Sequence, residues 1–105
     1  MTFVQQDILK KIKNSLKVNA PDATAFLYGS RARGDARADS DWDVLVLLDK
    51  IENELLDFKR IAYPLYDLGL EINEVISVNL YTKEDWEKRN FTPFYKNVQN
   101  EGIRL

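Results

Sequence analysis

The chain contains no cysteine and no histidine among its 105 residues. Without cysteine it can form no disulfide, iron–sulfur cluster or thiol nucleophile. Without histidine it has no imidazole base and no histidine-ligated zinc. The groups left for catalysis are carboxylates, hydroxyls, lysine, arginine and tyrosine, with any metal that they bind. This set suits chemistry at phosphorus, where positioning and charge stabilisation provide most of the catalysis.

The sequence also lacks a strong charge imbalance and a long apolar run. Fifteen basic residues stand against 17 acidic ones, for a net charge of −2. We therefore expect no general binding to nucleic acid. No run approaches the roughly 20 apolar residues of a membrane span, and the N-terminus is amphipathic rather than a signal peptide. We expect a cytoplasmic protein without membrane association, built as one domain over residues 1–105.

Apolar periodicity predicts an α+β fold of two layers, with a small mixed sheet and helices on one face. A Thr2–Gln5 capping box precedes an apolar stripe of helical spacing. Strands are expected over 23–28, 41–48 and 70–81. A helix is expected from Glu52 to about Leu68, with Leu55 among its inward residues, Pro64 kinking it or ending it early, and Gly69 as its stop. Shorter helices should begin at Thr82 and at Thr92–Pro93.

A glycine–serine turn follows the first expected strand. Gly29 permits close backbone approach to a phosphate. Ser30 offers a hydroxyl and a backbone N–H to phosphate oxygens. The nearby Arg31 and Arg33 are suited to charge-assisted hydrogen bonds with the same group. This segment is a candidate nucleotide-binding loop.

Two aspartates open the next apolar strand. Successive side chains of a strand point to opposite faces, so Asp41 and Asp43 share one face and Trp42 takes the other. Carboxylate pairs of this kind bind Mg²⁺, which also bridges to substrate phosphates. The loop and the acids together point to nucleotidyl transfer.

The pattern Gly29-Ser30-x10-Asp41-x-Asp43 resembles the signature of the DNA polymerase β-like nucleotidyltransferase superfamily. The chain looks like its shortest branch, the minimal nucleotidyltransferases, over roughly residues 23–80. The resemblance implies a polymerase β-like palm that transfers a nucleoside monophosphate, AMP from ATP, to an acceptor. It also implies two Mg²⁺ ions and three carboxylates, with the loop on the triphosphate and both aspartates on the metals.

The third carboxylate should come from the expected strand 70–81. Alternation places a mostly polar set on the face toward the cleft, namely Glu71, Asn73, Val75, Ser77 and Asn79. It favours Glu71 as the third acid, with Asn73 beside it. Glu74 is the alternative if a bulge shifts the phase. Asn73 can also stand where the family often has aspartate, which would leave a degenerate site.

The chain has no residues for the helical domain that binds base and acceptor in larger superfamily members. The resemblance implies a small helical partner of the HEPN class, often a toxin, with AMP added to a tyrosine of that partner. One alternative is a catalytically degenerate antitoxin that acts by binding alone. Another is a nucleotidyltransferase for an aminoglycoside-like alcohol, with its acceptor pocket completed by a homo-oligomer.

Aromatic residues gather in the C-terminal quarter, at Trp86, Phe91, Phe94 and Tyr95. We expect them to close the core of a small domain rather than to form an interface. We expect the same of Tyr63 and Tyr66.

Overall fold

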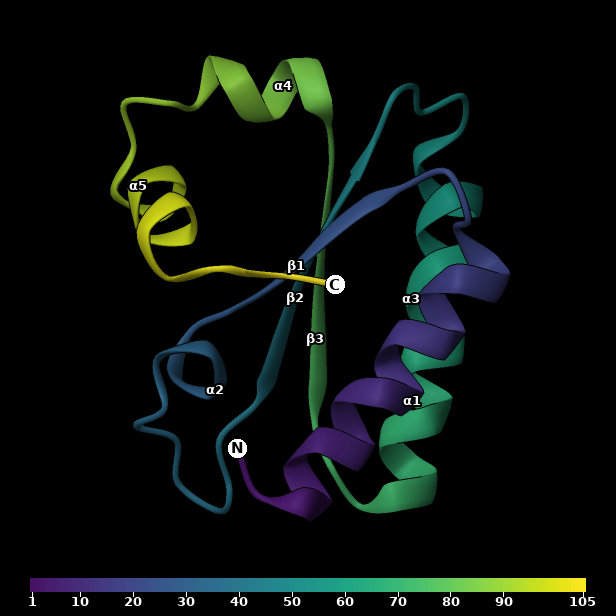
Figure 1. Ribbon diagram of the computed structural model, residues 1–105. Coiled ribbons are helices and arrows are strands. Elements are labelled where there is room, and N and C mark those ends of the chain that lie inside the picture. The colour runs from purple at the N-terminus through teal and green to yellow at the C-terminus, as the bar shows by residue number, and fades with distance from the viewer.

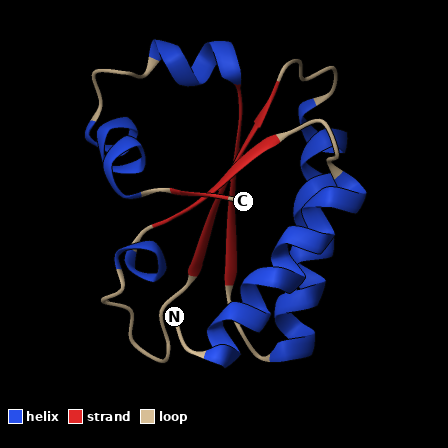
Figure 2. Cartoon of the chain, viewed as in Figure 1, coloured by secondary structure: helices blue, strands red, loops and turns tan.

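A four-stranded sheet forms the middle layer of the computed structural model, which describes all residues from 1 to 105 (Figure 2). The elements in chain order are α1 (Phe3–Asn19), β1 (Thr24–Tyr28), α2 (Ser30–Arg33), β2 (Trp42–Leu48), α3 (Glu54–Ile72), β3 (Ile76–Thr82), α4 (Lys83–Lys88), α5 (Pro93–Glu101) and β4 (Ile103–Arg104). The sheet order is β3-β2-β1-β4. Strand β2 runs antiparallel to β1 and parallel to β3. The predicted α+β fold with a mixed sheet is confirmed.

The two long helices α1 and α3 cover one face of the sheet (Figure 1). Their buried side chains meet every second residue of β2, including Trp42, Val44 and Val46, all fully buried. Because β2 is apolar on both faces, it can lie in the interior with a strand on either side.

The two short helices α4 and α5 cover part of the opposite face, in addition to the expected helical layer (Figure 1). Leu45 and Leu47 of β2 pack there against Trp86 of α4 and Val98 of α5. The ring of Trp86 stands edge-on to that of Phe94, with 5.2 Å between centroids. Trp86, Phe94 and Tyr95 therefore belong to the core cluster on this face, as predicted. The same expectation was wrong for Phe91 and for Tyr63, which are 74% and 50% exposed, because the connection after α4 and the outer side of α3 face solvent.

The predicted N-terminal signals of three helices are confirmed. The Thr2 hydroxyl accepts from the Gln5 N–H, and the Gln5 side chain accepts from the Thr2 N–H. Thr82 and Thr92 cap α4 and α5 in the same way. Each cap pairs an N–H group that a helix leaves without an internal partner.

Helix α3 is longer than the sequence predicted. It runs on through Pro64 and past Gly69 to Ile72, and Asn73 ends it in the left-handed conformation at φ 58°. Gly69 is instead a point of close approach, because a Cβ there would lie 2.5 Å from the carbonyl oxygen of Glu74. The expectation that Leu55 points inward was wrong, since it is 62% exposed.

We expect Gly69→Ala to lower the free energy of unfolding by about 1–3 kcal/mol, because the added methyl overlaps the turn between α3 and β3. Urea denaturation followed by circular dichroism measures the change. Asn73→Gly is the matched control in the same turn, and it should change stability by less than about 1 kcal/mol, since glycine adopts the left-handed conformation freely. Equal stability of Gly69→Ala and the parent would contradict the close approach.

Candidate active site

The polar side chains of the sheet gather where β1 ends and β2 begins. Pairing places Tyr28 of β1 and Ser77 of β3 on either side of Asp43 in β2. Asp41 lies on the same face, and its Oδ2 accepts a hydrogen bond of 3.2 Å from the Ser77 hydroxyl. Trp42 points to the opposite face and is fully buried. The sharing of one face by the two aspartates is confirmed.

The turn at Gly29 folds directly onto Asp43. Gly29 has φ 73°, and a Cβ built there would lie 2.3 Å from the Asp43 Oδ2. Only glycine combines this backbone conformation with so close a neighbour. Ser30, the first residue of α2, is thereby held beside the aspartates.

The two carboxylates influence each other electrostatically. Burial raises the pKa of Asp43 above its ordinary value, and the neighbouring Asp41 carboxylate raises it further. The Arg33 guanidinium acts in the opposite direction and lowers it. A divalent cation would relieve the repulsion between the carboxylates, because it neutralises both charges.

No third acidic residue completes a metal cluster with these aspartates. The placement of Glu71 on a strand was wrong: it is the penultimate residue of α3 and is exposed. Glu74 lies in the turn after α3, and its Oε2 is 3.7 Å from the Arg31 guanidinium. Asn73, expected beside Glu71 in the cleft, is instead the helix cap.

Strand β3 brings a hydroxyl and an amide to this face in place of a carboxylate. Sequence alternation predicted that Ser77 and Asn79 face the cleft, and their hydrogen bonds confirm it. The Asn79 side-chain amide donates to the Tyr28 hydroxyl at 2.6 Å, and the Tyr28 ring packs against Phe94 at 5.1 Å. Tyr28 therefore separates the polar site from the apolar cluster, a role that sequence reasoning missed although the residue precedes Gly29.

Arg31, predicted to bind phosphate, has its side chain held by other parts of the protein and acts as a structural clamp. It is 7% exposed and donates to the carbonyl oxygens of Ser40 at 2.9 Å and Ala38 at 3.3 Å. Its guanidinium also stacks on the Trp42 ring, 4.8 Å from the centroid. Arg31 thus ties the loop before β2 to the end of the sheet.

Arg33 is the guanidinium that remains on the aspartate side. It is exposed and forms ion pairs of 3.3 Å with Asp35 and with Glu101 of α5. Hydrogen bonds to these two carboxylates raise the pKa of Arg33, so its positive charge persists beside the site. These solvated ion pairs are weak, and a phosphate can replace them.

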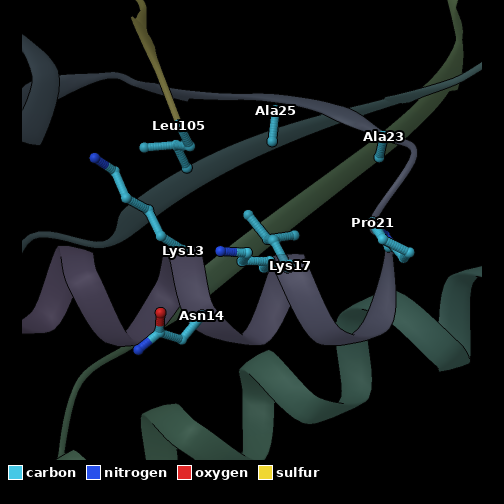
Figure 3. A pocket seen from close by; sticks show the side chains of 9 residues that line it. Lys13, Asn14, Lys17, Pro21, Ala23, Ala25 and Leu105 are labelled. Atoms are coloured by element: carbon cyan, nitrogen blue, oxygen red, sulfur yellow. The ribbon is translucent and has the colours of Figure 1, made fainter.

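A cavity of about 400 Å³ lies away from these residues (Figure 3). It opens between α1, the start of β1 and the C-terminal Leu105. Figure 3 shows Lys13 and Lys17 on the helix side of this cavity, across from the small side chains Ala23 and Ala25 of the strand side. None of the side chains that line it is acidic.

None of the chain's helices has the length and apolar character needed to cross a bilayer.

Comparison with known proteins agrees with this geometry. Residues 9–105 match the family described as "Nucleotidyltransferase domain". The chain belongs to this nucleotidyltransferase family. Membership makes it an enzyme of nucleotidyl transfer, and the match spans the glycine–serine turn, both aspartates and strand β3.

Individual relatives cover nearly the whole nucleotidyltransferase. The chain is 29% identical to "Putative protein adenylyltransferase MJ0604" of Methanocaldococcus jannaschii over 93% of its own length and 94% of that protein. It is 27% identical to a solved "putative minimal nucleotidyltransferase", with TM-score 0.63 and coverage of 96% of this chain and 95% of the other. The fold also matches a chain of the toxin–antitoxin complex MntA-HpeT, with TM-score 0.61, 19% identity and coverage of 92% and 70%.

We expect Asp43→Asn to raise the melting temperature of the metal-free nucleotidyltransferase at pH 7, on the order of 2 °C. Because the pKa of Asp43 is raised by folding, its ionised form opposes folding at neutral pH, and this cost vanishes below the ordinary pKa of aspartate. The gain should therefore shrink as the pH is lowered toward 4. Thermal melts with excess chelator measure it, and Asp39→Asn in the exposed loop is the control. A lower melting temperature at pH 7 would contradict this account.

We expect Arg31→Lys to lower the free energy of unfolding by about 2 kcal/mol, because lysine cannot reach two carbonyls and stack on Trp42 at once. Limited proteolysis should also cut the loop 34–41 faster. Arg33→Lys, at an exposed position in the same turn of helix, should stay within about 0.5 kcal/mol of the parent. If Arg31→Lys kept full stability, the clamp assignment would fail.

Proposed function

We propose that this nucleotidyltransferase transfers AMP from ATP to a hydroxyl of a protein partner, a small helical protein of the HEPN class. The observation that carries the proposal is the contact between the Gly29 turn and the Asp43 carboxylate. This contact supports the proposal because it would bring a phosphate-binding backbone against a pair of metal-binding carboxylates. The adenylyltransferase name of the relative and the AMP-PNP bound to a toxin–antitoxin neighbour of the same fold support the choice of ATP.

The glycine–serine turn would bind the triphosphate. Gly29 leaves its backbone uncovered, Ser30 presents a hydroxyl and an N–H, and Arg33 supplies positive charge. Arg31 contributes by holding the loop rather than by touching the substrate.

Asp41 and Asp43 would hold Mg²⁺, and the donor set fits that ion. Mg²⁺ is usually bound through one or two carboxylates together with substrate phosphates, which is what this face offers. When bound, the two ions implied by the family neutralise charge on the α-phosphate and on the leaving pyrophosphate. Ser77, bonded to Asp41, would orient that carboxylate toward the metal.

The reaction is a single displacement at the α-phosphorus of ATP. The acceptor oxygen forms a bond to this phosphorus as the bond to the bridging oxygen of the β-phosphate breaks. Pyrophosphate leaves, and the acceptor hydroxyl loses its proton. We assign acceptance of that proton to solvent water at the open site, because both aspartate carboxylates would be occupied by the metal.

The acceptor is proposed to be a protein because the relative from Methanocaldococcus jannaschii carries the name of a protein adenylyltransferase. The toxin–antitoxin neighbours pair a chain of this fold with a second protein. Modification of the partner would then act as the antitoxin function.

A second candidate is a nucleotide-binding antitoxin that acts by contact alone. The absence of a third carboxylate favours it, because Ser77 and Asn79 occupy the strand that faces the aspartates. A site with two carboxylates binds metal more weakly than one with three. The two candidates differ in whether Asp41 and Asp43 are needed for protection from the partner.

Transfer of label from α-labelled ATP tests the enzymatic proposal. With Mg²⁺ and the partner protein, we expect the parent to label the partner and Asp43→Asn to be at least about 100-fold slower. Asp39→Asn, an equally conservative change in the neighbouring loop, should keep the parent rate. Equal labelling by Asp43→Asn and the parent would overturn the site. If the Asp41→Asn/Asp43→Asn double variant transfers no label but still neutralises the partner, the antitoxin that acts by binding alone is established instead.

We expect Ser77→Asp to strengthen Mg²⁺ binding by about tenfold, because it places a third carboxylate beside Asp43 in the sheet register. Isothermal titration with Mg²⁺ and a non-hydrolysable ATP analogue measures the affinity. Thr82→Asp, at the far end of the same strand, is the control and should leave it unchanged. Unchanged affinity in Ser77→Asp would show that the metal is held elsewhere.

A further inference from the structure

Helix α3 carries an apolar stripe on the side that faces away from the sheet. Leu56, Tyr63 and Leu70 are 63%, 50% and 83% exposed. They are seven residues apart, which places them in one line along the helix, with a drift of only about 20° per step. The residues of α3 that face the core, Ile61, Ala62, Leu65 and Gly69, lie on the opposite side.

This stripe is a concentration of exposed apolar surface. Such patches on a small domain mark sites of association. Figure 1 shows α3 at the margin of the molecule, with the sheet between it and helices α4 and α5. The aspartates point to that other face of the sheet. A molecule docked on the stripe would therefore leave the nucleotide site open.

The stripe is symmetric about its centre. Leu56 and Leu70 stand at equal distances on either side of Tyr63, about 10 Å each at 1.5 Å per residue. A two-fold axis through Tyr63 and perpendicular to the helix would bring the Leu56 of one copy against the Leu70 of the other. This self-matching pattern is what an interface between identical copies requires.

The charges beside the stripe select the direction of pairing. Arg60 and Asp67 flank it on the same side, and both are exposed. Arg60 bonds Asp57 and the Asn19 carbonyl within its own chain, whereas Asp67 forms no ion pair. In an antiparallel pair centred on Tyr63, Arg60 lies within one residue of the height of the partner's Asp67. In a parallel pair the charged flanks of the two helices would lie on opposite sides of the contact, so this attraction would be absent.

We propose that two copies of this chain associate through their α3 helices, antiparallel, with the two Tyr63 side chains meeting on the axis. Opposite charges at Arg60 and Asp67, together with the symmetric stripe, favour a second copy over an unrelated helix. A contact confined to one helix of each copy is smaller than the roughly 800 Å² per partner of a standard interface. The dimer should therefore form and dissociate with concentration.

Cysteine cross-linking tests the proposal cleanly, because the chain contains no cysteine of its own. Under mild oxidation, we expect Tyr63→Cys to give a disulfide-linked dimer at least about ten times faster than Phe91→Cys. Phe91 is 74% exposed and lies in the connection between α4 and α5, so it reports random collision. Rates no faster than this control would overturn the proposal.

The direction of pairing is tested by two further variants. Leu56→Cys and Leu70→Cys should each stay monomeric when oxidised alone and should form a mixed dimer when combined. Dimers of Leu56→Cys with itself would establish parallel pairing and overturn the antiparallel assignment.

In sedimentation experiments without any added cysteine, the parent should show a concentration-dependent dimer, and Tyr63→Glu should remain monomeric with an unchanged circular dichroism spectrum. A parent that stays monomeric at several hundred micromolar would overturn the dimer and would indicate that the stripe binds a different protein.

Discussion

The site depends on the close approach of one backbone turn to one carboxylate. Gly29 lies so near Asp43 that a single methyl group would displace the carboxylate oxygen. The two residues are 14 positions apart in sequence, and antiparallel pairing of β1 with β2 brings them together. Everything else at the site is arranged around this contact. Arg31 secures the loop that connects the two strands, and Ser77 holds the neighbouring Asp41.

The residues predicted correctly from sequence are those whose surroundings follow from local spacing. The alternation of a strand places Asp41 and Asp43 on one face whatever lies beyond them. In the same way, alternation in β3 brings Ser77 and Asn79 to the cleft. Threonine caps are local too, and the starts of α4 and α5 followed from them.

The failures share a different physical cause, because each depends on where a long element ends or on what a side chain meets in three dimensions. In the sequence, the apolar alternation of β3 continues without a break into the end of α3, so alternation alone puts Glu71 on a strand. Asn73, a tolerant left-handed residue, sets the true boundary. Arg31 and Arg33 look equivalent in sequence. They differ only in three dimensions: Arg31 packs on Trp42 and bonds the carbonyls of the loop, whereas Arg33 stays exposed in ion pairs.

The distribution of the site residues over the strands and helices has a consequence for how such a domain can diversify in evolution. The glycine turn, the clamp and both aspartates fall within one hairpin of β1 and β2, whereas β3 adds only a hydroxyl and an amide. The C-terminal helices α4 and α5 pack on the same face but supply no acidic group to the pair of aspartates. Mutation can therefore reshape these helices, and with them the surface that an incoming molecule meets, while the hairpin retains its chemistry. The part of the domain that carries the aspartates can stay constant in evolution while the part that contacts other molecules changes.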